Sequence, residues 1–559
     1  MGQTKYLFAF KSENKGGLER MLKKMLKKKV LTIPVALTLF LSLILTGCGS
    51  AATSNSNQQA TNGQPLVIAM GADNTGLDPE TVMNNESGYI MAAIYNELVE
   101  YKSGSTDIAP GLADSWDISS DGLTYTFHLH QGIKFQDGTP FNADAVVAWL
   151  DRLLNKENPN YYAKRPGIDS YVDFTFHGVD IYKKLDDNTV QIHMTKPNAE
   201  FLNSLAMVWM GVTSPAAVEK YGQDFYKHPV GTGPFKFVEW VPNDHVTLDA
   251  NTDYWKGKPK LSKLIYRVIP ESSVRVMELQ KGTVDVLADV SPADSITLKG
   301  VNTVSLIEQP GLMVNGVALP TQVKPFNDPR VRQALNYAID KDNINKFLFK
   351  DLATTMNSPL PPTEWSYDKS LPGYPYNVDK AKQLLNEAGY PNGFDATLYV
   401  YPNPRSYNPV GGPDLGQALQ SDLKKIGVNI TLQQLEWGAF LAKVRSKDFS
   451  DMALAGWTGD NGDPDNFLDA LWGSDQIPSG NEAHYSNKDL DAVLGQALAT
   501  TDHNQRVTLY EKGQKIIMDD APWIFLNYST VIRATSTKVH GMVLNPTAMF
   551  FDMDKVSKD

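Results

Sequence analysis

The chain holds a single cysteine, Cys48, among 559 residues. One cysteine forms no disulfide within the chain and cannot supply the CxxC pairs of zinc or redox sites. Stability must therefore come from noncovalent packing. A chain of this length can bury large cores in two or three domains.

Familiar catalytic motifs are also missing. No HExxH, GxSxG or GxxxxGK[ST] sequence occurs, and GTGPF at 231–235 lacks the third glycine of a dinucleotide-binding loop. His128 and His130 could share one strand face and bind a metal, but a role on the strand surface is the favoured interpretation. The sequence thus predicts no enzyme activity, no metal and no cofactor.

Positive charge is scarce after the first 47 residues. That segment carries nine Lys/Arg and two Glu, which leaves 43 basic and 61 acidic residues and a net charge of −18 for the rest. A body this acidic repels phosphate backbones and anionic lipid, so nucleic acid is not an expected partner. A solvated acidic surface explains the same charge equally well.

An uncharged apolar run, Val30 to Thr46, follows the basic segment MLKKMLKKK. A basic segment before an apolar one is the layout of a secretory signal, and the run is at the short limit for a retained membrane anchor. The ending LTGC, Leu45 to Cys48, resembles the bacterial lipobox, in which the cysteine is lipidated. Residues 1–47 are therefore expected to be a lipoprotein signal peptide, with Met1, Met21 and Met25 as candidate starts.

The stretch GSAATSNSNQQATNGQP after Cys48 is small and polar. Such composition is typical of a flexible linker, and residues 48–65 are expected to tether a body that begins at Leu66.

The body alternates strand and helix patterns. Apolar residues recur at every second position in LTYTFHLH (123–130) and NTVQIHM (188–194), which predicts strands. Apolar stripes at helical spacing predict helices in DPRVRQALNYAID (328–340) and DKAKQLLNEAGY (379–390), with Gly389 as the terminator. A third helix leads through Gly427 into a strand. The fold class is predicted to be mixed α/β.

The loop GWTGDNGDPDN, Gly456 to Asn466, carries three aspartates and no positive charge. It could be a calcium loop, a solvated turn or an anchor for a cationic ligand. The EF-hand spacing fails because position six is Asn466 and position twelve is Trp472. Asp463 and Asp465 are expected to tie the turn around Pro464, because short Asx side chains favour local hydrogen bonds.

The segment LADSWDISSDGLTYTFHLHQGIKFQDGTPFNADAVV (112–147) resembles the signature of solute-binding proteins of peptide ABC importers. These are the large peptide/nickel-type receptors of family 5. GLDP, IYNELVEY, VGTGPFKFVEW, NTDYW and PFNDPRVRQALNYAID follow in the family's order. The resemblance extends from about Leu66 to Phe551.

Within that family, GWTGDNGDPDNF together with RSYNP (405–409) is similar to the dipeptide-binding branch. The resemblance implies that Asp460 binds the peptide's α-ammonium and Arg405 its carboxylate. Both charges lose water on enclosure, and a charge-assisted pair offsets that cost. The other residues predicted to line the ligand are Trp457, Thr458, Gly459, Tyr407 and Gly88. Turn capping by Asp460, a surface position for Arg405 and a core position for Trp457 are the alternatives.

Three departures from the branch leave the ligand open. The usual cysteine pair is missing from the region of Leu471 to Asp491, GLMVNGVALPTQVKPF is less aromatic than usual, and NNESGYI (84–90) is only loosely similar. Longer oligopeptides, glutathione, haem and nickel chelates are bound by relatives and remain alternatives.

The family implies a two-lobed periplasmic-binding-protein fold with a hinge. The first lobe is expected to comprise 66–309 plus 529–559, with an extra subdomain inserted at about 97–227, and the second to comprise 310–528. A lipid-anchored monomer on the outer face of the bacterial cytoplasmic membrane, extracytoplasmic or periplasmic, would capture a small peptide. It would then deliver the peptide to an ABC permease and its ATPases.

Overall fold

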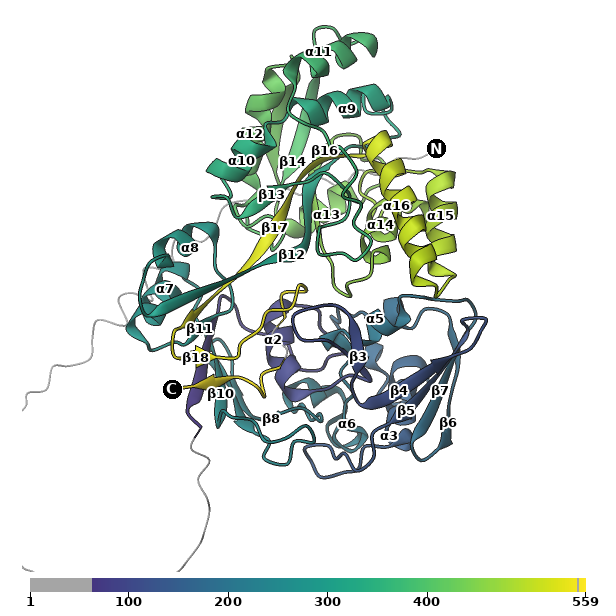
Figure 1. Cartoon of the computed structure of the whole chain (residues 1–559), viewed down its shortest axis with the longest axis vertical. Helices are drawn as coiled ribbons and strands as arrows, with labels where there is room; N and C mark the ends of the chain where they lie inside the picture. Colours follow the sequence, from purple (N-terminus) through teal and green to yellow (C-terminus); the bar gives the residue numbers. More distant parts are fainter. Residues whose placement is uncertain (1–62, 550–551) are drawn as a thin grey trace, which may run out of the picture. The chain divides into compact units, whose positions relative to one another are not determined.

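The computed structural model describes residues 63–549 and 552–559. It confirms the mixed α/β fold class (Figure 1). The predicted signal peptide, the lipidated Cys48 and most of the predicted tether lie outside the described residues. The first strand begins at Pro65, one residue before the predicted start of the body. No helix within the described ranges is long and apolar enough to cross a bilayer.

Eleven strands of the described residues form one large sheet. In spatial order they are β15 (Asn429–Gln434), β14 (Asp395–Val400), β16 (Met452–Thr458), β12 (Val304–Ala318), β17 (Trp523–Ser536), β11 (Val286–Leu287), β1 (Pro65–Met70), β10 (Lys263–Val268), β9 (His245–Ala250) and β8 (Phe235–Val241), with β13 (Ala353–Thr355) beside β17.

The two longest strands of this sheet, β12 and β17, run antiparallel through its centre (Figure 1). The last part of β12 pairs with β16, and the last part of β17 pairs with β11. The register between β12 and β17 shifts between Pro310 and Val314 and again between Asn315 and Gly316. Each half of the sheet is therefore joined to the other through this one strand pair.

Smaller sheets accompany the large one. The antiparallel order β4 (Ala113–Ile118), β5 (Thr124–Leu129), β7 (Thr189–Met194) and β6 (Val179–Asp186) contains both strands that alternation predicted. In β5 the burial alternates as expected, with Tyr125, Phe127 and Leu129 buried. Two short pairs complete the strands: β2 (Val99–Tyr101) with β3 (Ile108–Pro110), and β18 (Val539–His540) with β19 (Ser557–Lys558).

Helices cover these sheets over the described residues. The α-helices are α2 (Asn85–Ile94), α3 (Ala143–Leu154), α4 (Val172–Thr175), α5 (Phe201–Leu205), α6 (Pro215–Tyr221), α7 (Ser272–Lys281), α8 (Pro292–Leu298), α9 (Pro329–Ala338), α10 (Lys341–Phe347), α11 (Val378–Glu387), α12 (Gly412–Lys424), α13 (Trp437–Val444), α14 (Asp465–Trp472), α15 (Lys488–Leu498) and α16 (His503–Asp520). The 3₁₀ helices are η1 (Tyr162–Lys164), η2 (Val208–Met210), η3 (Gly222–Lys227) and η4 (Ser474–Gln476).

Local sequence explains the boundaries of the predicted helices. The Asn377 side chain caps α11 by accepting from the Lys380 N–H, and Gly389 follows the helix with φ of 88°. Gly427 separates α12 from β15 with φ of 81°. Helix α9 begins at Pro329 behind its cap Asp328. These three helices are confirmed as predicted.

A buried ion cluster lies in the core around α3. The Arg152 guanidinium donates to both carboxylate oxygens of Asp78, at 3.1 and 2.6 Å, and also to Glu80. The Trp149 indole N–H donates to the other oxygen of Glu80 at 2.8 Å. Burial raises the pKa of Glu80 well above its ordinary value, against the opposing charge of Arg152. The GLDP segment thus enters the core through a charged contact.

Candidate functional site

The acidic loop begins where β16 leaves the large sheet. Thr458 is still paired with Met313 of β12, and the next residue, Gly459, donates its N–H to the Leu312 carbonyl at 2.6 Å. A Cβ on Gly459 would lie 2.4 Å from the Phe467 ring. The close approach requires glycine here, and it aims the chain from the sheet into the loop.

We expect Gly459→Ala to lower the stability of the protein by about 1–3 kcal/mol, because the ring of Phe467 and the loop must move apart. Thermal or denaturant unfolding measures the change. Gly438→Ala is the matched control, since an added Cβ there meets nothing within 4 Å and lies in α13. Equal stability of the two variants would contradict this packing argument.

Asp460 follows as the first carboxylate of the loop. Its Oδ2 accepts a hydrogen bond from the Tyr171 hydroxyl, and its N–H donates to Asn466 Oδ1 at 3.1 Å. Among the described residues no lysine, arginine or histidine forms an ion pair with it. Burial raises the pKa of the Asp460 carboxyl to about 7, although the bond from Tyr171 lowers it. The carboxylate is thus available to a cation that replaces the tyrosine hydroxyl.

Asn461 fixes the loop to the segment around α5. Its amide nitrogen donates to Glu200 Oε2 and to Ser204 Oγ, each at 3.1 Å. Its carbonyl oxygen accepts from the Tyr101 hydroxyl at 3.1 Å and from the Asn203 amide at 3.2 Å. These four contacts hold the acidic loop against residues more than 250 positions earlier in the chain.

Carboxylates are in excess beneath the loop. Asp463 pairs with Arg506 at 2.8 Å and also accepts the N–H of Asp465, the local turn contact that the sequence predicted. The Glu364 carboxyl is buried without a hydrogen-bond partner among the described residues. Burial, reinforced by Asp463, raises the pKa of Glu200 to about 8. The surroundings favour protons and cations over anions.

Arg405 supplies the opposite charge. Its guanidinium stacks on the Trp437 ring at 3.5 Å from the centroid, and it lies 5.8 Å from the Tyr401 centroid. Its Nε is buried and has no hydrogen-bond partner among the described residues, and none of their carboxylates forms an ion pair with it. Residues 405–408 form the Arg405 loop, which is closed by reciprocal backbone hydrogen bonds between Arg405 and Asn408, at 3.0 and 2.9 Å.

The Arg405 loop lies against the strand that carries the acidic loop. Ser406 Oγ and Thr458 Oγ1 are hydrogen-bonded at 2.9 Å. The Tyr407 ring covers Gly456, where a Cβ would lie 2.2 Å from it, and the Tyr407 carbonyl accepts from Ser529 Oγ at 2.7 Å. Thr458 and Tyr407 therefore connect the two loops, while the side-chain termini of Arg405 and Asp460 stay free of each other.

Trp457 lines a cavity of about 900 Å³. Its indole N–H donates to Asn466 Oδ1 at 3.0 Å, and its ring is partly buried against the core cluster that includes Phe467. The cavity is bounded by residues 170–178 and 195–200 on one side and by Arg445 and residues 465–480 on the other. Trp457 thus both fills core and offers one edge to a space large enough for a small organic ligand.

Gly88 is a buried residue of α2. A Cβ there would lie 2.9 Å from the Trp209 ring and 3.0 Å from the Met549 sulfur. Trp209 and Met549 line a small gap together with Asp460. Gly88 therefore permits the close packing of Trp209 and Met549, which line the gap beside Asp460.

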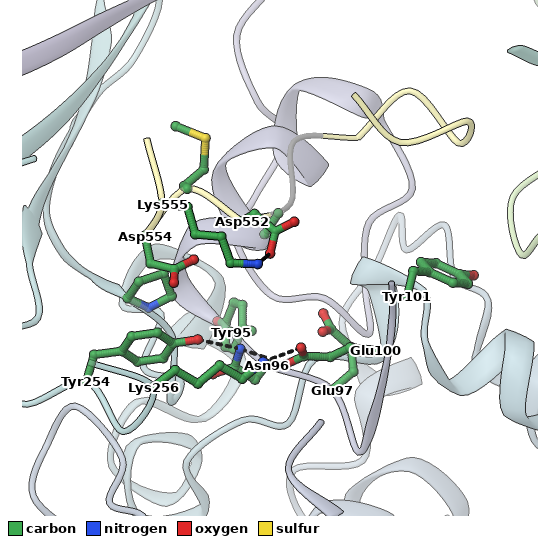
Figure 2. Close-up of a pocket in the computed structure, with 13 residues that line it drawn as sticks. Tyr95, Asn96, Glu97, Glu100, Tyr101, Tyr254, Lys256, Asp552, Asp554 and Lys555 are labelled. Carbon is green, nitrogen blue, oxygen red and sulfur yellow. Dashed lines mark hydrogen bonds and ion pairs between the residues drawn. The ribbon is translucent and has the colours of Figure 1, made fainter. Parts of the chain in front are cut away.

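A separate pocket of about 70 Å³ lies beside the C-terminal end of α2 (Figure 2). Asn96 donates to Glu100 at 3.1 Å and to the Tyr254 hydroxyl at 3.2 Å, and Lys256 pairs with Glu100. Glu97 contributes a buried oxygen without a partner among the described residues. A volume of about 70 Å³ has room for a few water molecules, so the pocket is too small for a peptide.

The two histidines considered as a metal pair have separate partners from β4. His128 lies 2.9 Å from Asp117, and His130 lies 2.6 Å from Asp114. Both acidic partners lie on the strand next to β5, so no local sequence pattern joins them to the histidines. Over the described ranges, no group of three or more His, Cys, Asp or Glu is arranged to hold a metal ion.

Sequence reasoning missed the residues that surround the acidic loop. Tyr171, Glu200 and Asn203 carry no motif and lie far away along the chain, and Arg506 lies on α16. Only the excess of acidic residues in the loop hinted that a cation such as Arg506 must approach it.

The chain is similar to known proteins over most of its length. Residues 107–479 match the sequence profile of bacterial extracellular solute-binding proteins, family 5. "Heme-binding protein A" of Haemophilus influenzae is 36% identical over 93% of this chain and 97% of its own length. The "Dipeptide-binding protein" of Escherichia coli is 38% identical over 81% of this chain and 87% of its own.

A solved structure shares the architecture. It is an ABC transporter-associated periplasmic binding protein from Helicobacter pylori in complex with the peptide STSA. The TM-score is 0.74 with 34% identity, and the match covers 89% of this chain and 98% of the other. The likeness extends over both halves of the described body.

Proposed function

Because the chain belongs to the bacterial extracellular solute-binding proteins of family 5, we propose that it captures dipeptides for an ABC importer. As a member of this family it is a solute-binding receptor. Under the proposal, the receptor encloses the peptide and passes it to a membrane permease whose ATPases drive import.

One observation carries the proposal: two opposite charges on neighbouring loops lack counter-charges. Asp460 has no cationic partner and Arg405 no anionic one among the described residues, while Ser406 and Thr458 join their loops. A dipeptide zwitterion presents an ammonium and a carboxylate, and binding would pair both of these partly buried charges at once. The similarity to the dipeptide-binding protein of Escherichia coli supports a dipeptide as the ligand.

A longer peptide is the second candidate. The cavity of about 900 Å³ beside Trp457 offers more space than the two peptide termini need. The similar Helicobacter pylori protein was determined with the peptide STSA, which supports this alternative. The Haemophilus influenzae relative named for haem keeps haem as a ligand to test.

The lobe boundaries and the hinge belong to the proposal. Residues 66–309 with 529–559 would form the first lobe, including the inserted subdomain of about 97–227, and 310–528 would form the second. Support comes from the register shift between Pro310 and Val314, where β12 and β17 depart from regular pairing. A bend there would let ligand contacts from Tyr171 and Trp457 close around the peptide.

Cys48 and the permease complete the proposed cycle. A lipid on Cys48 would keep the receptor on the outer face of the cytoplasmic membrane, where one monomer would meet its permease. Globomycin sensitivity of processing or metabolic labelling with a fatty acid tests the anchor. Absence of the fatty-acid label from protein with Cys48 intact would contradict the lipid anchor.

Calorimetric titration tests the ligand. The purified protein is unfolded and refolded to remove carried-over ligand, and then a dipeptide, a tripeptide, the dipeptide amide and haem are compared. Binding of the dipeptide alone supports the proposal. Equal binding of the tripeptide would instead support longer peptides as ligands. Binding of haem alone would overturn the proposal of peptide capture.

If Arg405 binds the peptide carboxylate, amidation of the dipeptide should weaken binding to the wild type by at least about tenfold, which corresponds to roughly 1.4 kcal/mol. In Arg405→Ala the acid and the amide should bind equally, because the cation that distinguishes them is gone. Titration of both ligands into both proteins measures this.

Arg267→Ala is the control for the loss of an arginine, since Arg267 forms a half-exposed pair with Glu278 on another part of the sheet. It should keep the full preference for the free acid. A wild type indifferent to amidation would remove Arg405 from the site.

A further inference from the structure

A further cavity, of about 230 Å³, is lined by residues of α10, β13 and the segment after Pro372. Lys341 forms its floor and is only 4% exposed, whereas the rim residues Asn357 and Tyr376 are exposed. The residues that line this cavity share none with the walls around Asp460 or Trp457. It is therefore distinct from the peptide site.

The ammonium of Lys341 has unusually few partners for a buried charge. Its Nζ donates to the Tyr374 carbonyl at 3.2 Å and lies 5.7 Å from the centroid of the Tyr374 ring. No carboxylate of the described residues forms an ion pair with it. Burying a charge without its counter-charge is costly, so such a lysine either releases its proton or takes an anionic partner from outside the protein.

The surrounding groups favour a small organic acid. The Tyr374 and Tyr376 rings and two prolines supply apolar walls, while Thr355 and Asn357 add polar side chains. Near the rim, Lys425 donates to the Tyr376 hydroxyl at 3.2 Å, and its own charge is paired with Asp422 at 2.7 Å. Asp342 is the one acidic wall residue. It is exposed to solvent, and its carboxylate already accepts from Thr355 at 2.6 Å.

We propose that this cavity is a second ligand site, in which Lys341 binds the carboxylate of a small organic monoacid whose flat apolar body lies against Tyr374 and Tyr376. The site takes one anion and is independent of peptide capture. The volume suits a ligand of benzoate size rather than a peptide.

Titration of Lys341 makes the site sensitive to pH. Burial lowers the pKa of Lys341 to about 7, opposed by the charge of Asp342. The other charged or titratable groups around it are Tyr374 and Tyr376 of the rim segment, and Asp422 and Lys425 at the end of α12. A bound anion favours the ammonium form. Anion affinity should therefore fall as the pH rises above 7, with proton uptake on binding.

Calorimetry with benzoate as the probe tests the proposal on the purified protein. Because only the ammonium form binds the anion, benzoate should bind about fiftyfold more weakly at pH 9 than at pH 7. Buffers of different ionisation enthalpy should reveal proton uptake near pH 7.5. Benzamide, which has the same shape without the charge, should not bind.

Lys341→Met should lose at least tenfold in benzoate affinity together with the proton uptake, while it binds the dipeptide as the wild type does. Lys346→Met, at an exposed position of the same helix, should keep benzoate binding. Undetectable benzoate binding to the wild type, equal binding of benzamide, or unchanged binding by Lys341→Met would each overturn the site. These benzoate measurements do not depend on dipeptide binding, so failure of the peptide proposal would leave them unaffected.

Discussion

Asp460→Asn is expected to weaken dipeptide binding by at least tenfold, about 1.4 kcal/mol, because it removes the counter-charge of the peptide ammonium. The amide can still accept from the Tyr171 hydroxyl and leaves the loop contacts of Asn461 in place. The effect should therefore appear in ligand affinity and not in stability. Titration calorimetry and thermal unfolding of the same samples separate the two.

Two controls test whether this loss of affinity comes from the Asp460 charge. N-acetylated dipeptide should bind the wild type poorly, since it lacks the ammonium, and should lose little further in Asp460→Asn. Asp489→Asn makes the same chemical change at an exposed position of α15 and should bind as the wild type does. Equal affinity of wild type and Asp460→Asn would take Asp460 out of the site.

The same carboxyl sets the pH dependence of binding. The pKa of Asp460 is about 7 in the free protein, so binding an ammonium below that pH must displace a proton and affinity falls. The α-amino group of a peptide has a pKa of about 7.7–8.0, so affinity also falls at higher pH. Affinity should be highest between these values, and the acidic limb should vanish in Asp460→Asn.

Arg152→Met is expected to cost about 3–5 kcal/mol of stability, because it leaves the Asp78 carboxylate buried without its counter-charge and removes a hydrogen-bond donor from Glu80. Methionine keeps most of the side-chain volume, so little of the loss comes from a cavity. Without the guanidinium, burial raises the pKa of Asp78, and protonation of this carboxyl relieves the cost. The deficit should therefore shrink as the pH falls from 8 to 5, which denaturant unfolding at several pH values measures.

Lys184→Met provides the matched control. Lys184 also contacts two carboxylates, Asp144 at 2.8 Å and Asp187 at 2.6 Å, but these are exposed. Its loss should cost less than about 1 kcal/mol. Combining Arg152→Met with Asp78→Asn and Glu80→Gln should recover part of the lost stability. No recovery would mean that packing, and not charge, dominates at this position.

Local pattern carried most of what could be predicted about the fold. The stripes of α9 and α11 and the alternation of β5 lie within single segments, where side-chain period and terminating residues determine the element. The fifteen residues of β12 could not be foreseen, because Pro310 and Gly311 interrupt its pattern and its partners are β16 and β17, over a hundred residues away. Long-range pairing leaves no periodic trace.

In the candidate site, too, local features could be predicted from the sequence and long-range contacts could not. The family resemblance, now confirmed by the match over residues 107–479, identified Asp460 and Arg405 through short motifs. Their roles stay predictions. The Tyr171 hydroxyl on Asp460 could not be inferred, since 289 residues separate the two and neither local pattern points to the other. The Asp463 turn contact was predictable because it is local, whereas its pairing with Arg506 was not.

The place of β17 determines when the protein can fold. It is the strand between β12 and β11, so the two halves of the large sheet meet only through residues 523–536, near the end of the chain. Until those residues are available, the strands of the two halves cannot pair, and contacts of such sequence separation form slowly. A chain that emerges N-terminus first would complete the large sheet only after almost all of it had emerged. Completion of the large sheet is therefore expected to be a late step of folding.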